Sequence, residues 1–108
     1  MILPYFSGAV GRTEEKKTIV NVITAVSRLK QQSISYMKVG EITAEGRDLV
    51  FYLDNLEINR LFLPQLTSFA HHIYFNRNGI TRGGEIILKF GRIYKVSIAE
   101  VSGKISVE

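Results

Sequence analysis

The chain divides into two parts that differ in the spacing of their apolar residues. Residues 12–39 contain neither Gly nor Pro over 28 positions, and both residues destabilise a helix interior. Apolar residues recur there at steps of three and four, which is the period of one helix face. This face consists of Ile19, Val22, Ile23, Val26, Leu29, either Ser33 or Ile34, and Met37. The pattern predicts one amphipathic helix of about 40 Å that packs through this face and stops at Gly40.

Beyond Gly40, short runs rich in β-branched and aromatic residues alternate with glycines. Such runs favour strands, and the glycines between them favour turns. The pattern predicts about six short antiparallel strands, at residues 47–54, 57–62, 69–76, 85–90, 93–99 and 104–107. Because each run follows the previous one after a short connection, we expect a meander.

One predicted strand shows which face of the sheet is buried. Tyr94, Val96 and Ile98 alternate with polar or small residues, so one face is apolar and should pack against the helix. One long helix followed by strands is an α+β arrangement. We therefore predict a single α+β domain over 1–108, helical over 1–39 and forming an antiparallel β-sheet head over 40–108.

Composition narrows the chemistry. A chain of 108 residues forms one domain, and the absence of Cys excludes disulfides and thiolate metal sites. The net charge of +4 first indicates a nucleic acid or an anionic membrane as partner. However, residues 1–39 hold six basic and two acidic residues, whereas residues 40–108 hold eight of each sign. The whole excess of positive charge thus belongs to the helical part.

Residues that could carry a reaction are few. His71 and His72 are adjacent on a predicted strand, so they point to opposite faces and cannot chelate one ion together. Asp48 and Asp54 share a strand face but lie about 20 Å apart by the rise per residue, too far to act on one bond. We expect no catalytic residue, no metal and no cofactor, and hence not an enzyme.

Two further features concern phosphate and nucleic acid. The glycine-rich segment 79–84 has predicted strands on both sides, whereas a phosphate-binding loop leads from a strand into a helix, so we interpret it as a wide turn. Tyr74 and Phe75 beside Arg77 and Arg82 offer stacking rings next to basic groups. Since neighbouring strand residues alternate between faces, one of the two rings should belong to the core.

The C-terminal half carries an ordered set of motifs. They read Ile73-Tyr-Phe-Asn-Arg-Asn-Gly79-Ile-Thr-Arg-Gly83-Gly84-Glu-Ile-Ile-Leu-Lys89, then Tyr94-Lys-Val-Ser-Ile98, then Ser102-Gly103-Lys-Ile105-Ser-Val107. This order resembles the minor pseudopilins of type II secretion, of the GspH/FimT type, and nearly as closely the competence pseudopilin ComGD. Gly79, Gly83, Gly84 and Gly103 stand at the turns of that pattern. Glu85 stands where the family often has Thr, and the family's N-terminal leader and cleavage signature are absent from this sequence.

The resemblance implies a pilin-like fold and a structural role. The opening Met1-Ile-Leu-Pro4-Tyr-Phe6-Ser-Gly8 looks like the end of the family's membrane helix, which residues up to 39 would continue. Such a subunit would be anchored in a bacterial inner membrane, with its head in the periplasm or another extracytoplasmic space. Its partners would be other pseudopilins and the secretion apparatus or an exported protein. Arg12, Lys16 and Lys17 would then contact lipid headgroups or a neighbouring subunit.

Two alternatives remain open at this point. The first is a minor pilin of a type IV pilus or competence system, which shares the fold and differs in cargo, such as DNA. The second is a small basic module that binds nucleic acid and has no membrane anchor.

Overall fold

The structure is a computed structural model, and it describes residues 13–68 and 72–108. One helix, α1 (Thr13–Tyr36), is followed in this part of the chain by eight strands. Their bounds are β1 (Gly40–Glu45), β2 (Asp48–Leu53), β3 (Leu56–Phe62), β4 (Leu66–Ser68), β5 (Ile73–Phe75), β6 (Gly84–Lys89), β7 (Ile93–Ile98) and β8 (Ile105–Val107). The α+β class predicted from the pattern is confirmed.

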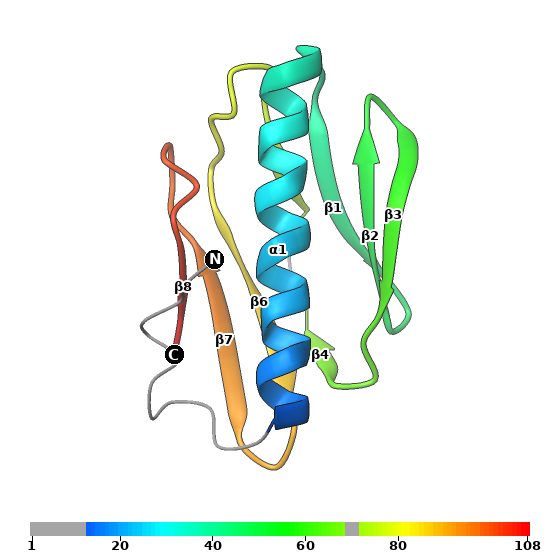
Figure 1. Cartoon of the computed structure of the whole chain (residues 1–108), viewed down its shortest axis with the longest axis vertical. Helices are drawn as coiled ribbons and strands as arrows, with labels where there is room; N and C mark the ends of the chain where they lie inside the picture. The colour runs from blue at the N-terminus through cyan, green and yellow to red at the C-terminus, as the bar shows by residue number, and fades with distance from the viewer. Residues whose placement is uncertain (1–12, 69–71) are drawn as a thin grey trace.

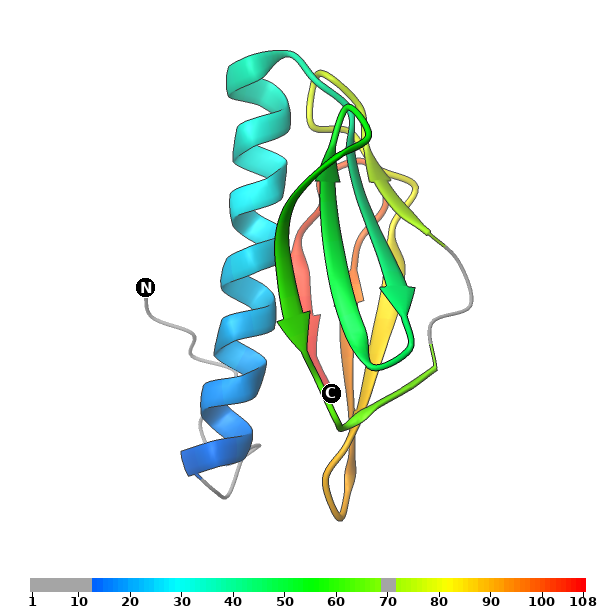
Figure 2. The same cartoon turned by 90° about the vertical axis from the view of Figure 1, so that its right-hand side faces the viewer.

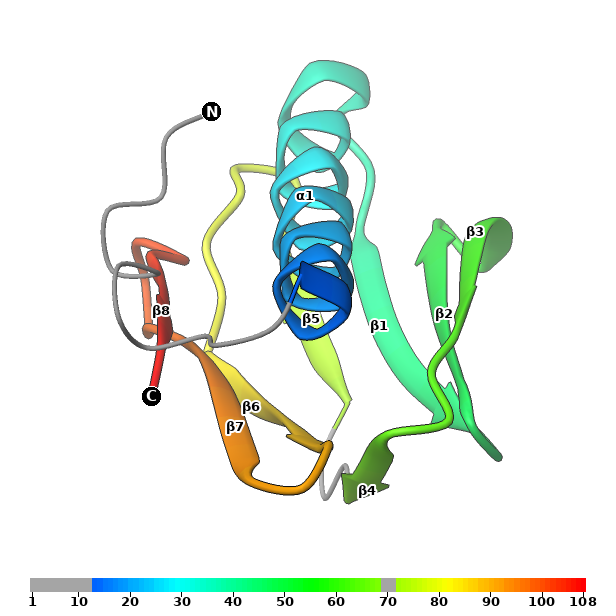
Figure 3. The ribbon, with the colours of Figure 1, turned by 60° about the horizontal axis from the view of Figure 1, so that its bottom comes forward.

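The eight strands form two antiparallel sheets rather than one meander. The first sheet has the order β3-β2-β1-β5 and the second β4-β6-β7-β8. Figures 1 and 2 show α1 running along one side of both sheets. Figure 3, an oblique view from the start of the helix, shows the sheets diverging on either side of it. The chain therefore crosses between the sheets three times, from β3 to β4, from β4 to β5 and from β5 to β6.

Most of the predicted helix face is correct. Its buried members, each at most 1% exposed, are Ile19, Val22, Ile23, Val26 and Leu29. The choice left open between Ser33 and Ile34 falls to Ser33, which is fully buried and donates a hydrogen bond to the Leu29 carbonyl, while Ile34 is 41% exposed. The 24-residue helix is about 36 Å long by its rise per residue.

Met37 was predicted on the packing face, and this is wrong. The helix ends at Tyr36, and Met37 has a φ of 53° and a side chain that is 70% exposed. The Met37 amide donates to the Ile34 carbonyl at 3.3 Å and the Lys38 amide to the Ser33 carbonyl at 3.0 Å. These two bonds make up a Schellman cap, in which the residue after the helix adopts the left-handed conformation.

Gly40 is not the helix stop that the sequence indicated. It is the first residue of β1 and lies against the helix. A Cβ atom at this position would stand 2.4 Å from Ser33 Oγ and 3.0 Å from Leu29 Cγ. Glycine is therefore needed here so that the strand can approach the helix closely.

The strand predictions were right for the hairpins and incomplete elsewhere. The predicted strands at 47–54, 57–62, 85–90, 93–99 and 104–107 match β2, β3, β6, β7 and β8 to within one residue at each end. The six-strand prediction missed β1 and β4. Of the predicted strand 69–76, residues 69–71 lie outside the described part, and of the remaining residues only Ile73–Phe75 form a strand, β5. Strand β4 has three residues and β1 begins with Gly40, so neither shows a strong local pattern.

One core joins the helix to both sheets. Ile42, Phe51 and Phe75 from the first sheet and Val96 and Leu88 from the second belong to the same buried cluster as the helix face. Tyr94, Val96 and Ile98 are all buried, which confirms the predicted inward face of that strand. Within the described residues, no helix has both the length and the apolar character needed to cross a membrane.

Candidate functional site

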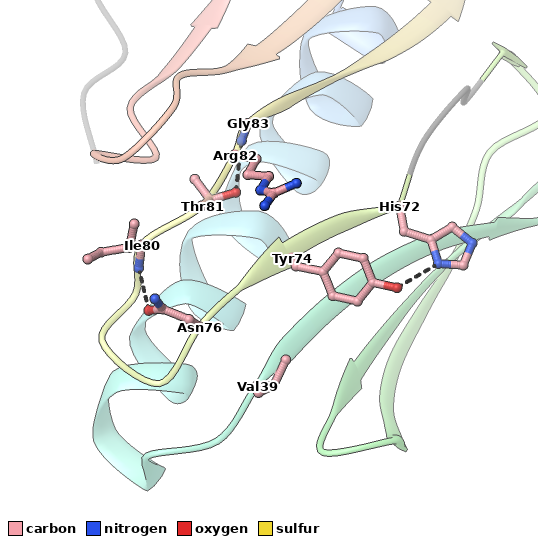
Figure 4. Close-up of a pocket in the computed structure, with 8 residues that line it drawn as sticks. All are labelled: Val39, His72, Tyr74, Asn76, Ile80, Thr81, Arg82 and Gly83. Atoms are coloured by element: carbon pink, nitrogen blue, oxygen red, sulfur yellow. Dashed lines mark hydrogen bonds between the residues drawn. The ribbon is translucent and has the colours of Figure 1, made fainter.

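A hollow lies on the side of the first sheet that faces away from the helix. It is an open groove of about 720 Å³, which we call the Tyr74 groove. Its lining consists of Val39, then His72, Tyr74 and Asn76 in and beside β5, then residues 80–83 (Figure 4). Tyr74 is 49% exposed while Phe75 is fully buried, so the prediction that one of the two rings belongs to the core is confirmed.

The strand register arranges the groove in rows. Glu41 pairs with Tyr74 across β1 and β5, and the bridge between Phe75 and Thr81 continues the ladder on the other side of β5. By antiparallel counting, Tyr74 then lies between Glu41 and Arg82. The same counting places Asn76 between Val39 and Ile80, and the Asn76 amide indeed donates to the Ile80 carbonyl at 2.9 Å. The groove thus has a row with the Tyr74 ring and the Arg82 guanidinium beside a mainly apolar row, and the Glu41 carboxylate borders the first row in an adjoining hollow.

The loop that forms one wall is held by hydrogen bonds from its own side chains. Asn76 Oδ1 accepts from the Asn78 amide at 2.9 Å and from the Ile80 amide at 3.0 Å. Thr81 Oγ1 accepts from the Gly83 amide at 3.0 Å, and the Thr81 carbonyl accepts from the Val101 amide at 2.7 Å. Arg82 therefore projects from a backbone that is fixed on both sides.

A polar cluster fixes the orientation of the Tyr74 ring. His72 Nδ1 lies 2.6 Å from Glu41 Oε2 and 3.2 Å from the Tyr74 hydroxyl. The pKa of Tyr74 is raised, first by desolvation and then by the negative charge of Glu41. The Tyr74 hydroxyl accordingly stays protonated throughout the neutral range, with Glu41 and His72 as its partners.

A second polar cluster lies on the same face, across β1, β2 and β3. The Arg60 guanidinium contacts Glu57 at 2.9 Å, Asp48 at 2.7 Å and Glu45 at 3.4 Å. The hydrogen bonds to Glu57 and Asp48 raise the pKa of Arg60, and the bond from Arg60 lowers the pKa of Glu57. Since Arg60 of β3 pairs with Asp48 of β2 and Glu45 of β1, this cluster ties the edge strand β3 to the sheet.

The structure separates the residues considered for catalysis. Asp48 belongs to the Arg60 cluster, whereas Asp54 Oδ1 accepts from the Val39 amide at 2.8 Å at the other end of β2. His71 lies outside the described residues, and His72 is occupied by Glu41 and Tyr74. In residues 13–68 and 72–108, no three His, Cys, Asp or Glu side chains come together as metal ligands.

The motif glycines lie in or next to turns, at positions where a larger residue would be strained or would clash. Gly79, Gly83 and Gly103 have positive φ values of 78°, 81° and 70°. Gly84 needs no left-handed backbone, but a Cβ there would lie 2.6 Å from Ile73 Cγ1. The segment 79–84 connects β5 to β6 and precedes no helix, as expected for a turn.

Of the predicted lipid or neighbour contacts, Lys16 and Lys17 are exposed in the first turns of α1, and Arg12 lies outside the described residues. Of the groove residues, the sequence had singled out His72, Tyr74, Arg82 and Gly83, and it had included Ile80 and Thr81 in the glycine-rich segment 79–84. It had not indicated Val39, which joins the groove through the long-range pairing of β1 with β5, for which the local sequence contains no signal. The groove combines a concave shape with a cation and an exposed aromatic ring, and these features are typical of a binding surface.

In the comparisons with known proteins, no family model, no curated protein and no solved structure matches the chain.

Proposed function

We propose that this chain is the head of a minor pseudopilin, a structural subunit that works by packing into a fibre used in protein secretion. One observation carries the proposal, namely that a single 24-residue helix lies along both antiparallel sheets and precedes every described strand. In such an arrangement one helix face holds the head together while the opposite face stays free for neighbours. The function then resides in interfaces rather than in a reaction.

Two further features support the proposal. The motif glycines that carry the family resemblance stand where the backbone needs them, in the order β5, turn, β6, β7, turn, β8. The exposed Lys16 and Lys17 lie at the start of α1, the end that a preceding membrane segment would join. Cations at this level stabilise contact with anionic headgroups by about 1 kcal/mol each.

The alternative of a type IV or competence pilin involves the same fold and packing, and it differs in the cargo. The alternative of an independent nucleic-acid module differs in kind, since it requires no anchor and no fibre. The location of the natural protein in the cell separates the two pilin classes from the nucleic-acid module.

The test is to express the complete reading frame in its own host and fractionate the cells. We expect the protein in the membrane fraction, released by detergent and not by high salt, with a head that protease digests once the outer membrane is permeabilised. A variant lacking everything before Thr13 should leave the membrane. Recovery of the complete protein in the cytoplasm would overturn the proposal.

A further inference from the structure

The Tyr74 groove has the dimensions and composition of a binding site. Its volume of about 720 Å³ falls within the range of ordinary ligand sites. Val39 and Ile80 are exposed apolar residues that flank it, 37% and 45% exposed respectively. Apolar side chains gathered in a hollow favour a partner that can cover them.

The groove is already formed. The Asn76 side chain and the Thr81 side chain hold the loop, and a Cβ at Gly83 would lie 2.5 Å from the Ile98 carbonyl oxygen, so the wall is packed directly against the second sheet. A partner would therefore bind without ordering this segment, which lowers the entropic cost of binding.

Arg82 is the cationic residue of the groove, and it has no ion-pair partner among the described residues. Within residues 13–68 and 72–108, no carboxylate pairs with Arg82, in contrast to Arg60 and Lys95, which both have acidic partners. Figure 4 shows its guanidinium directed over the hollow beside the Tyr74 ring. A guanidinium presents a fork of N–H donors, and carboxylate and phosphate are the two groups that such a fork binds best.

The surroundings favour a protein segment over a nucleic acid. One exposed ring stacks at most one base, because Phe75 is in the core. The carboxylates of Glu41 and Asp54 lie beside Tyr74 and Arg77 in the adjoining hollow, and they would repel a phosphate backbone with one negative charge per nucleotide more than a peptide whose single carboxylate faces Arg82. By contrast, the two rows of the groove are about 7 Å apart, two residues along β5, which is also the spacing of side chains on one side of an extended peptide.

We propose that the Tyr74 groove binds an extended segment of another protein in which a carboxylate and an apolar side chain stand two residues apart. The carboxylate pairs with Arg82 beside the Tyr74 ring, and the apolar side chain packs between Val39 and Ile80. The inference goes beyond the proposed function and does not depend on it, since it concerns this surface alone.

The test uses the isotope-labelled chain and nuclear magnetic resonance, which detects weak binding residue by residue. The probe is the capped pentapeptide Ser-Glu-Ser-Leu-Ser. We expect saturable shifts confined to the amides of Tyr74, Asn76, Ile80, Thr81, Arg82 and Gly83. Replacing Glu by Gln in the peptide should weaken binding roughly two- to fivefold, as for an exposed ion pair.

Matched variants separate this contact from general charge attraction. Arg82→Gln should weaken binding of the Glu peptide by the same factor as the change of Glu to Gln in the peptide weakens binding to the native chain. Making both changes together should cause no further loss of binding. Arg47→Gln removes the same charge from the turn at the far end of β1 and should leave binding unchanged. The unshifted remainder of each spectrum reports whether the variant is folded.

Three results would overturn the proposal. Equal binding of the Glu and Gln peptides would show that Arg82 does not bind the carboxylate. Equal binding of Ser-Glu-Leu-Ser-Ser would show that the two-residue spacing is not recognised. Tighter binding of a short oligothymidylate at the same amides would assign the groove to nucleic acid instead.

Discussion

At the scale of single residues, the sequence predicted turns correctly where a positive φ is taken by glycine, and it misplaced the helix end, where Met37 takes it. Three of the four motif glycines have the positive φ that their place in a turn suggested. Met37 also has a positive φ, 53°, without being glycine. This is why Gly40 indicated a helix end three residues too late. A cap whose left-handed position is filled by an ordinary side chain has no signature in one sequence.

Met37→Gly is expected to stabilise the protein by about 1 kcal/mol, because it removes the steric cost of a Cβ in the left-handed region while losing little burial. Urea unfolding measures the difference. Gly79→Ala is the opposite case, since φ is 78° and the new Cβ would meet Ile34 Cδ1 at 2.6 Å, and it should destabilise. A Met37→Gly variant less stable than the native chain would contradict the Schellman cap.

At the scale of elements, helix and hairpins follow from local patterns, and the division into two sheets does not. The three-and-four spacing specified the helix face, and the alternation of Tyr94, Val96 and Ile98 specified the inward face of β7. The pairing of β5 with β1 and of β4 with β6 joins segments distant in sequence. The Tyr74 groove depends on the first of these pairings, so its residues could be named in part but not assembled.

Val96→Asp is expected to prevent folding, because it places an unpaired charge in the core at a cost of several kcal/mol. Ile98→Asp should act in the same direction. Ile93→Asp on the same strand is the control, since Ile93 is 65% exposed and lies opposite Lys89. Circular dichroism melts compare the three variants. A normal melt for Val96→Asp would show that the register of β7 is wrong.

The closeness of α1 to β1 gives a separate expectation. Gly40→Ala should destabilise by about 1–3 kcal/mol, because its Cβ would overlap Ser33 Oγ and force the strand away from the helix. Gly91→Ala, where nothing lies within 4 Å of the new atom, should change stability little. If thermal unfolding shows both alanine variants to be equally stable, β1 does not lie as close to the helix as described.

At the scale of the whole molecule, the helix has one buried face and one exposed face. One is buried in a core shared by both sheets. Lys17, Asn21 and Arg28 follow a single stripe on the exposed side, at steps of four and seven. We propose that neighbouring subunits of a fibre meet at this stripe, which the packing of the helix on the head holds in place.

The most direct measurement of that claim is a cysteine cross-linking scan along α1 in cells that assemble the fibre, which the absence of native Cys makes possible. We predict adducts with other pilin-like subunits from cysteines at Lys17, Asn21 and Arg28, and none from cysteines at the buried positions Ile19 and Val26. Absence of adducts along the whole helix would contradict the role of this protein as a packed subunit.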